Sequence, residues 1–452
     1  MHIPPNVFKA YDIRGLVDKE VTTDLAFATG VAFAHFLQLE REPASVVIGE
    51  DMRPSSPTLA DAFSAGVTSL GLDVYRIGLS STDMLYFAAG KLNLPGAMFT
   101  ASHNPAAYNG IKLCLSGARP IGKESGLVAI ENFVREGVPI HPRNPGIEHK
   151  KEMLEEYVDH LLTLVDLSGI RKLKVVIDAG NGMAGHTAPA VFKRLNCEMI
   201  PMYFELDGTF PNHEANPIDE ENLADLKAAV KKHKADIGLA FDGDADRCFL
   251  VDEQGRAVNP SDLTSLVASR ELAKYPGSTI IYNLISSKAV PEVVAENGGK
   301  AVRSRVGHSY IKKLMAETGA VFGGEHSGHF YFRDFWRADS GMLAALHAIA
   351  ALGTSDGSLS KILAPFQRYV ASGEINSEVK DAKKKIEEIK AIYSPQSGIE
   401  YDELDGLTIS ADTWWFNLRA SNTEPLLRLN VEAESANLMA QVRDEVLATV
   451  RG

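Results

Sequence analysis

Three aspartates on alternate residues are the feature of this chain with the clearest chemical meaning. Asp242, Asp244 and Asp246 stand between two apolar runs, and Arg247 follows them directly. Carboxylates packed this closely raise one another's pKa unless a positive charge compensates them. Oxygen ligands on a short loop suit a hard divalent cation, and Mg²⁺ fits best because it also binds phosphate oxygens. The spacing therefore predicts a magnesium site at residues 242–247.

Two other interpretations of this acidic loop are a solvated turn and an EF-hand. A solvated turn is compatible with the sequence, because Asp and Gly are common in ordinary turns. An EF-hand is disfavoured, since the loop ends in Arg247 and lacks the glutamate that closes a calcium loop. Residues 237–241 read as a buried strand, and ligands gather where such strands end. This position favours a binding site.

A second loop, residues 100–105, places Ser102 beside His103 after an apolar segment. The pair suggests a nucleophile or a phosphate carrier, although Ser and His are also common in turns. A hydrolase is disfavoured because the Gly-x-Ser-x-Gly elbow is missing. A phosphorylated Ser102 would supply negatively charged oxygens that complete a magnesium shell with the three aspartates.

Two further loops carry polar groups suited to a phosphorylated sugar. Residues 323–329 present a carboxylate, a hydroxyl and imidazoles, which can hold neighbouring sugar hydroxyls. Residues 419–424 begin with Arg419, whose guanidinium can bind a phosphate dianion in bidentate fashion. Taken alone, each of these loops is also compatible with a simple turn.

The elements that must position these loops alternate between strand-like and helix-like patterns. The pairs are 45–49 with a helix through 59–70, 173–177 with 187–195, 279–282 with 289–296, and 320–322 with 342–352. This alternation predicts a largely parallel α/β architecture. The last segment differs and predicts a smaller α+β unit, with strands at 373–379, 406–409, 414–418 and 426–431 and helices at 381–392 and 436–450.

A chain of 452 residues is too long for one hydrophobic core. Residues 137–151 are rich in proline, glycine and charge, and we interpret them as a linker. With two further breaks, the pattern predicts four domains, at 1–147, 148–251, 252–365 and 366–452. Because three of the polar loops each follow a short apolar strand, three similar domains could direct them into one cleft.

Composition excludes several classes of protein. The chain has 59 acidic and 46 basic residues and a net charge of −13, which argues against a general nucleic-acid binder. Its three cysteines lack metal spacing, so neither a disulfide framework nor a zinc site is supported. The sequence begins without a secretory segment and contains no apolar run of about 18 residues, as a membrane span would need. We expect a cytoplasmic protein that acts on small molecules, and the sequence leaves its oligomeric state open.

A competing motif lies at residues 180–185, where three glycines follow a strand and precede a helix. With Glu205 about twenty residues later, this pattern matches a dinucleotide-binding fingerprint and would indicate a nicotinamide-dependent oxidoreductase. That function would leave the aspartates, the serine loop and the arginine loop without roles. A metal-binding protein without catalytic activity is a further alternative.

Taken in order, five segments resemble the α-D-phosphohexomutases, in particular the phosphomannomutase/phosphoglucomutase group. They are residues 11–15, 100–105, 242–247, 324–329 and 419–423, and they span essentially the whole chain. The resemblance implies an α/β fold with three related mixed α/β domains and a smaller α+β C-terminal domain around a central cleft. In chain order, the four domains would carry the phosphoserine, the metal, the sugar-recognition loop and the phosphate-binding loop.

The resemblance also implies roles for individual residues. Ser102 would be the phosphoserine and would bind Mg²⁺ together with Asp242, Asp244 and Asp246. The groups near the transferring phosphoryl group and proton would be Ser102, His103, Arg14, Lys112 and His329, and which of them is the general base stays open. The substrate would contact Tyr11, Arg247, His308, Glu325, Ser327, Arg419, Ser421, Asn422 and Thr423.

The implied activity is the interconversion of mannose 6-phosphate and mannose 1-phosphate, together with the corresponding glucose phosphates. A hexose 1,6-bisphosphate would be both intermediate and activator. His326, between Glu325 and Ser327, resembles phosphomannomutases or dual-specificity enzymes more than phosphoglucosamine mutases, which stay the alternative. The expected partner is a phosphosugar, with no nucleic acid and no membrane.

Overall fold

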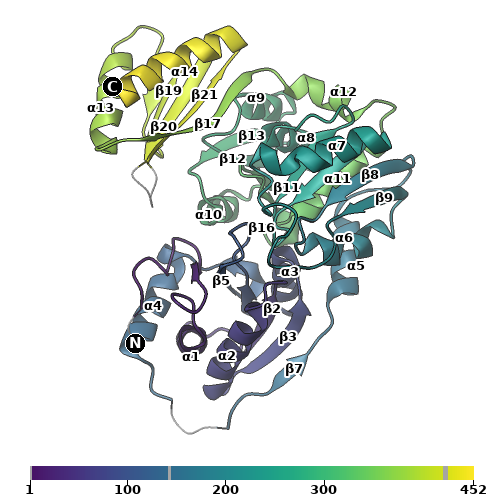
Figure 1. Cartoon of the computed structure of the whole chain (residues 1–452), viewed down its shortest axis with the longest axis vertical. Coiled ribbons are helices and arrows are strands. Elements are labelled where there is room, and N and C mark those ends of the chain that lie inside the picture. Colours follow the sequence, from purple (N-terminus) through teal and green to yellow (C-terminus); the bar gives the residue numbers. More distant parts are fainter. Residues whose placement is uncertain (1–2, 141–143, 421–425) are drawn as a thin grey trace. The chain divides into compact units, whose positions relative to one another are not determined.

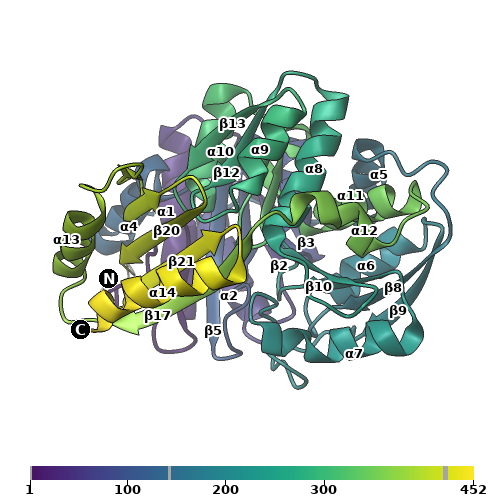
Figure 2. The same ribbon diagram turned by 90° about the horizontal axis from the view of Figure 1, so that it is seen from above.

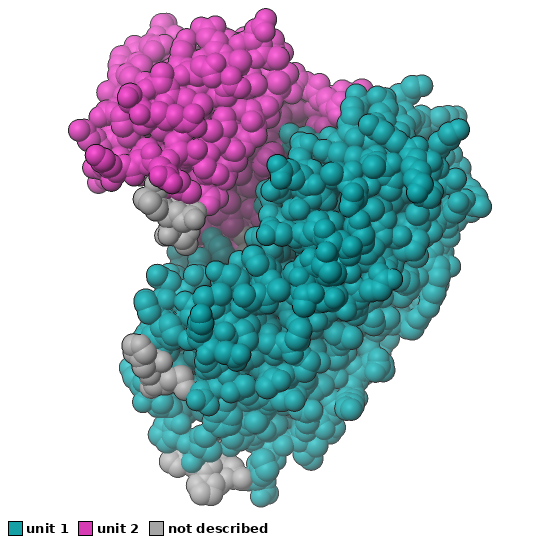
Figure 3. All heavy atoms as spheres, in the orientation of Figure 1, with its two compact units in different colours: residues 1–259, 327–362 teal, residues 260–326, 363–452 magenta. Residues whose placement is uncertain are grey.

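The computed structural model describes residues 3–140, 144–420 and 426–452. The chain forms two compact units, which Figure 3 shows in different colours. Unit 1 contains residues 1–259 and 327–362, and unit 2 contains residues 260–326 and 363–452. Within the described residues, no helix combines the length and the apolarity that crossing a lipid bilayer requires.

A seven-stranded sheet forms the first part of unit 1, in the order β1-β5-β4-β2-β3-β7, with β6 beside β5. Strands β4, β2, β3 and β7 are parallel, whereas β5 is antiparallel to β4 and to β1. The strands are β1 (Ile13–Leu16), β2 (Ser45–Glu50), β3 (Asp73–Leu79), β4 (Gly96–Phe99), β5 (Tyr108–Leu115), β6 (Arg119–Pro120) and β7 (Glu148–Lys150).

Four helices accompany this sheet: α1 (Thr23–Leu39), α2 (Ser56–Ser69), α3 (Thr82–Leu92) and α4 (Leu127–Glu136). Helices α1, α2 and α4 share one apolar core with strand residues such as Val46, Ile48 and Phe99, because alternate strand side chains point to the same face. Figure 1 labels these three helices. Ser81 caps α3 by accepting a hydrogen bond from the Met84 amide. This cap fixes where α3 begins, which matters for the site described below.

The second part of unit 1 is a four-stranded sheet in the order β11-β10-β8-β9. Its strands are β8 (Leu173–Asp178), β9 (Cys197–Met202), β10 (Ile237–Phe241) and β11 (Cys248–Asp252), and its helices are α5 (Leu154–Leu164), α6 (Ala184–Phe192) and α7 (Ala224–His233). Strands β8, β9 and β10 are parallel, while β10 and β11 form an antiparallel pair. The acidic loop therefore joins two adjacent, fully buried strands.

Unit 1 is completed by residues 327–362. They form the antiparallel pair β15 (Phe330–Phe332) and β16 (Ala338–Asp339) and the helix α11 (Gly341–Gly353), and α12 (Leu359–Leu363) follows. Helix α11 is buried along almost its whole length because it is apolar on all sides.

Unit 2 contains a parallel arrangement, β13-β12-β14, and a five-stranded antiparallel sheet, β17-β21-β20-β19-β18. The first comprises β12 (Thr279–Asn283), β13 (Lys300–Ser304), β14 (Phe322–Gly324), α8 (Pro260–Lys274), α9 (Ala289–Glu296) and α10 (His308–Thr318). The second comprises β17 (Val370–Glu378), β18 (Glu400–Asp402), β19 (Leu407–Ser410), β20 (Trp414–Ala420), β21 (Leu426–Ala433), α13 (Ala382–Tyr393) and α14 (Ala436–Arg451). Helix α14 lies along this sheet against β17 and β21 (Figure 2).

The observed elements agree with the predicted alternation of strands and helices, with three corrections. The helix predicted at 187–195 lies at Ala184–Phe192. The strand predicted at 320–322 lies at Phe322–Gly324. The segment 137–151, interpreted as a linker, contains β7, which pairs in parallel with β3 through Val74 and Glu148. Its side chains are polar and largely exposed, so the strand rests on main-chain hydrogen bonds at a sheet edge and leaves no apolar pattern.

Candidate active site

The acidic loop is a tight turn between β10 and β11 that carries its own arginine. Asp242 accepts hydrogen bonds from the Arg247 amide at 3.2 Å and from its Nε at 2.8 Å. Ala245 has a left-handed backbone, with φ of 59°, and its amide donates to the Asp242 carbonyl. All three aspartates are fully buried. The turn thus gathers their carboxylates at one point.

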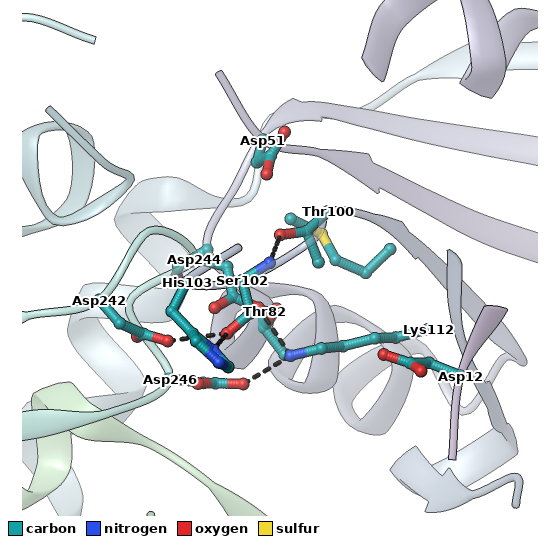
Figure 4. Close-up of polar contacts among 12 residues, drawn as sticks. Asp12, Asp51, Thr82, Thr100, Ser102, His103, Lys112, Asp242, Asp244 and Asp246 are labelled. Carbon is teal, nitrogen blue, oxygen red and sulfur yellow. Dashed lines mark hydrogen bonds and ion pairs between the residues drawn. The ribbon is translucent and has the colours of Figure 1, made fainter. Parts of the chain in front are cut away.

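The serine loop meets the acidic loop at that point (Figure 4). The Ser102 hydroxyl donates to Oδ2 of Asp242 at 2.8 Å and lies 3.2 Å from Nδ1 of His103. The Ser102 backbone is left-handed, with φ of 51°, and its amide donates to the Thr100 hydroxyl. Non-glycine residues in this conformation are strained and depend on their surroundings to hold them.

Two glycines allow the loops to approach. A Cβ on Gly243 would lie 2.4 Å from the Ser102 carbonyl oxygen, and one on Gly182 would lie 2.7 Å from the Gly243 carbonyl oxygen. The same Gly243 carbonyl accepts a hydrogen bond from the Met183 amide. The glycine motif at 180–185 therefore packs against the acidic loop. Its composition is explained by this contact and does not require a dinucleotide.

The carboxylates fit a divalent cation. Asp242, Asp244 and Asp246 each offer an oxygen within 4.8 Å of the others. Oδ1 of Asp244 and Oδ1 of Asp246 are buried and accept no hydrogen bond, which is costly for a charged oxygen. Mg²⁺ prefers carboxylate oxygens of this kind. The three aspartates, with an oxygen on Ser102, could hold the ion.

Lys112 of β5 supplies positive charge to the same cluster. Its Nζ donates to Asp244 at 2.6 Å and to Asp246 at 2.7 Å. Burial alone would lower the pKa of Lys112, but the two aspartates raise it well above its usual value. Burial would likewise raise the pKa of Asp244, yet Lys112 and a hydrogen bond from Thr82 hold it below its usual value. Lys112 is therefore a cation and Asp244 an anion at neutral pH.

The pKa values of Asp242 and His103, which both contact the Ser102 hydroxyl, are shifted in opposite directions. Burial raises the pKa of Asp242, and the charges of Asp246 and Asp244 add to this effect against the opposing charge of Arg247. The charge of Arg247, followed by burial and Arg14, lowers the pKa of His103 well below its usual value. His103 is therefore neutral, and its ring can accept a proton.

Arg14 and His329 complete the predicted catalytic set. Nη1 of Arg14 donates to the Asn104 side chain at 2.7 Å, beside the serine loop. His329 forms a strand-like bridge with Arg247, and its Nε2 lies 3.6 Å from Asp246. Its Nδ1 is 2.9 Å from the Ser327 hydroxyl. The structure thus brings Ser102, His103, Arg14, Lys112, His329, Ser327, Arg247 and the three aspartates together within unit 1.

Tyr11 also belongs to unit 1, where it is half-buried in the turn that precedes β1. The other predicted substrate residues belong to unit 2. Glu325 follows β14, is buried, and its Oε1 accepts hydrogen bonds from the Gly307 amide at 3.1 Å and the Asn283 side chain at 3.4 Å. His308 is the first residue of α10, directly after Gly307.

Arg419 lies near the end of β20, with its guanidinium 3.6 Å from Glu374 and 3.6 Å from Asp405. The predicted phosphate-loop residues that follow it, Ser421, Asn422 and Thr423, lie outside the described residues.

The sequence did not reveal Thr82, the first residue of α3. Its hydroxyl donates to Oδ2 of Asp244 at 2.6 Å, and its amide donates to the Asp244 carbonyl at 3.0 Å. Ser81 and Thr82 indicate a helix start, but nothing in the local sequence indicates a partner 162 residues away. Arg53, whose contacts are described below, was missed for the same reason.

Comparison with known proteins identifies the class. The sequence matches the phosphoglucomutase/phosphomannomutase family models for the three α/β/α domains at residues 5–138, 155–255 and 259–369, and for the C-terminal domain at 374–449. The chain therefore belongs to the phosphoglucomutase/phosphomannomutase family of enzymes. The predicted family and fold class are confirmed.

Individual members of the family are similar to this chain over nearly its full length. A phosphomannomutase of Escherichia coli is 41% identical, with 98% of this chain and 99% of that protein covered. A phosphomannomutase/phosphoglucomutase of Pseudomonas putida is 36% identical over 98% of this chain and 95% of that protein. The crystal structure of a family protein from Burkholderia thailandensis superposes with a TM-score of 0.91 at 31% identity, covering 100% of this chain and 98% of that one.

Proposed function

We propose that this enzyme is a magnesium-dependent phosphomannomutase that also converts the corresponding glucose phosphates. The observation that carries the proposal is the 2.8 Å hydrogen bond from the Ser102 hydroxyl to Asp242 of the acidic loop. A phosphoryl group on that hydroxyl would lie beside three carboxylates able to hold a metal ion and two cations able to neutralise charge. Full-length relatives named phosphomannomutase, one of them also phosphoglucomutase, support the substrate class.

In the proposed reaction, phosphorylated Ser102 transfers its phosphoryl group to the free hydroxyl of a hexose monophosphate. The O–P bond at the serine breaks, a new O–P bond forms on the sugar, and the sugar hydroxyl gives its proton to a nearby base. The serine oxygen takes up a proton as it leaves. The resulting hexose 1,6-bisphosphate then gives its other phosphoryl group to Ser102. In this step the O–P bond on the sugar breaks, an O–P bond to the serine forms, the serine hydroxyl proton passes to a nearby base, and the sugar oxygen takes up a proton. The serine is phosphorylated again, so the bisphosphate is both intermediate and activator.

The residues around Ser102 would act mainly through position and charge, as is general for phosphoryl transfer. Mg²⁺ held by the three aspartates would neutralise charge on the phosphoryl oxygens. Neutral His103 lies 3.2 Å from the Ser102 hydroxyl and can take its proton when the serine is phosphorylated. Lys112 stays protonated beside its two aspartates and would contribute charge.

Recognition of the sugar would fall to Glu325, Ser327 and His308, with Tyr11 and Arg247 as further contacts. Glu325 and Ser327 would bind sugar hydroxyls, and His326 between them favours mannose over glucosamine. Arg419, with Ser421, Asn422 and Thr423, would grip the phosphate that is not reacting, because a guanidinium pairs with a phosphate dianion through two parallel hydrogen bonds.

A mutase assay on Ser102→Ala tests the proposal. Wild type should convert mannose 1-phosphate and glucose 1-phosphate in the presence of Mg²⁺ and glucose 1,6-bisphosphate. The alanine variant should lose at least about 1,000-fold in turnover, because it lacks the hydroxyl that carries the phosphoryl group. Ser116→Ala is the matched control, since Ser116 is a turn serine in the same sheet region that contacts Arg119.

One result would reject the proposed mechanism, and another would reject the proposed substrate. Undiminished turnover in Ser102→Ala would reject the phosphoserine mechanism. Conversion of glucosamine 1-phosphate in preference to both other sugars would replace the substrate assignment and leave the chemistry in place.

A further inference from the structure

Arg53 is a buried arginine that none of the roles above uses. It follows β2, and its side chain is completely shielded from solvent. Nη1 donates to the carbonyl oxygens of Pro105 and Tyr108, each at 2.9 Å. Nη2 donates to the carbonyl oxygens of Ser102 at 2.9 Å and Asn104 at 2.7 Å. Three of these acceptors belong to the loop that carries the reactive serine, and the fourth, Tyr108, begins β5 just after it.

The guanidinium is itself fixed in place. Its Nε donates to Oδ2 of Asp51 at 3.2 Å, and Asp51 accepts further hydrogen bonds from the Arg53 amide and the Ser56 hydroxyl. The ring of Phe210 lies 5.1 Å from the guanidinium carbon. All five N–H groups of this planar fork are therefore in use. A lysine could not reproduce the arrangement, since it has three donors on a single nitrogen.

Asp51 reaches the same loop by a second route. Burial raises the pKa of Asp51, the side chain of Thr100 helps to lower it, and the Thr100 hydroxyl accepts a hydrogen bond from the Ser102 amide. Asp51, Thr100 and Ser102 lie near one another in Figure 4. The Asp51–Arg53 pair thus holds the carbonyl oxygen of Ser102, while Thr100 holds its amide.

The constraint has a physical purpose at this position. Ser102 has a left-handed backbone, and such a conformation persists only where the surroundings hold it. Phosphoryl transfer depends on placing the reacting oxygen accurately, and a misplacement of about 1 Å can cost about 100-fold in rate. Four hydrogen bonds from one rigid, buried group are suited to provide that accuracy.

We propose that Arg53 is a positioning residue for phosphoryl transfer, which holds the serine loop so that the Ser102 hydroxyl faces the acidic loop. Arg53 touches neither the hydroxyl nor the metal ligands' carboxylates through any hydrogen bond described above, so its effect on the reaction passes through the loop. This inference rests on the proposed mutase function. It predicts a loss of turnover without a matching loss of substrate binding.

The test compares Arg53→Met and Arg53→Lys with wild type in the mutase assay, with turnover normalised to the folded fraction measured by circular dichroism. Arg53→Met should lower kcat by about 100-fold and Arg53→Lys by about 10-fold or more, while KM for mannose 1-phosphate changes less than about threefold. Arg76→Met is the matched control, because Arg76 on β3 is also largely buried but pairs with Glu50, Asp61 and Glu148. It should stay within about threefold of wild type.

Amide hydrogen exchange adds a readout independent of activity. In wild type, the Asn104 and Tyr108 amides, which donate to the Ala101 and Pro105 carbonyls, should exchange slowly. In Arg53→Lys they should exchange faster, while amides of α1 keep their wild-type rates. A general loss of stability would accelerate both sets.

Several results would overturn the inference. A folded Arg53→Met variant with kcat within threefold of wild type is one, and a fall in kcat matched by the Arg76→Met control is another. If neither Arg53 variant folds, hydrogen exchange in the wild type tests the inference. Exchange of the Asn104 and Tyr108 amides as fast as in an unfolded chain would contradict the proposal that Arg53 holds the serine loop. An absence of mutase turnover in the wild type would instead reject the proposed function. Amide hydrogen exchange would then still test whether Arg53 holds the serine loop in place.

Discussion

The two units hold their candidate site residues in different ways. In unit 1, the charged groups around Ser102 are buried and joined by short hydrogen bonds, such as those from Lys112 to Asp244 and Asp246 at 2.6 and 2.7 Å. In unit 2, Arg419 lies 3.6 Å from each of two carboxylates, beyond the about 2.7–3.2 Å of a good hydrogen bond. The groups around Ser102 are therefore fixed by protein partners, whereas Arg419, which we propose as the phosphate-binding arginine, is loosely paired and could exchange its partners for ligand oxygens.

The comparison predicts that a change in the acidic loop removes turnover. Asp244→Asn keeps the size of the side chain and its acceptor for Thr82 but removes a charge from the metal site. We expect kcat to fall by about 100-fold to 1,000-fold at saturating substrate and Mg²⁺, as for the loss of one preorganised electrostatic group. Steady-state mutase kinetics measure this. Asp225→Asn, an exposed aspartate of α7, should be unaffected.

Metal binding can be followed in the same variants without activity. Mg²⁺ should raise the melting temperature of wild type and Asp225→Asn, because a ligand that binds only the folded state stabilises it. Asp244→Asn should show little or no rise. An equal rise in all three proteins would place the metal elsewhere.

Changing the arginine of unit 2 should affect binding more than chemistry. Arg419→Met should raise KM for mannose 1-phosphate about 10-fold or more, since a hydrogen bond to a charged group contributes about 1.5–3 kcal/mol, and should change kcat less than threefold. Arg428→Met is a close control, because Arg428 lies opposite Arg419 across β20 and β21 and also pairs with Glu374. A lower kcat at unchanged KM in Arg419→Met would contradict the expectation that this residue of unit 2 serves binding while unit 1 serves the chemistry.

The smallest expected effect concerns stability in unit 2. Burial raises the pKa of Asp262 on α8 from 3.8 to about 7, against a hydrogen bond from Gln367. The folded protein then binds a proton that the unfolded chain has lost between about pH 4 and 7, so the contribution of Asp262 to stability falls as pH rises through that window.

Asp262→Asn removes this titration and can still accept the Gln367 hydrogen bond. Relative to wild type, the variant should gain about 2 kcal/mol in free energy of unfolding between pH 5 and pH 8. Urea unfolding at both pH values measures the difference, with the exposed Asp444→Asn as control. A difference that is the same at both pH values would show that Asp262 is ionised throughout.

Local sequence patterns predicted most of the fold and the loops that carry the candidate site residues, but not the contacts between those loops. Apolar periodicity gave the strands and helices, and turn residues at strand ends marked the loops with Ser102, Asp242 and Arg419. Contacts between residues that lie far apart in the sequence could not be predicted. Neither the Thr82 hydrogen bond to Asp244 nor the hydrogen bonds from Arg53 to the serine loop leave a local signal, because each depends on how separate loops pack. The edge strand β7 was missed because its side chains are polar and follow no apolar pattern.

The most direct test of the account follows the phosphoryl group itself. Protein phosphorylated on Ser102 is mixed with one equivalent of mannose 1-phosphate, and the intact mass of the protein is followed together with the sugar products. The account predicts that the protein transiently loses one phosphoryl group as an equal amount of hexose 1,6-bisphosphate forms, at a rate no slower than turnover, and that it regains the group as mannose 6-phosphate appears. If mannose 6-phosphate accumulates while the mass of the phosphorylated protein stays constant and no bisphosphate forms, the central claim is wrong.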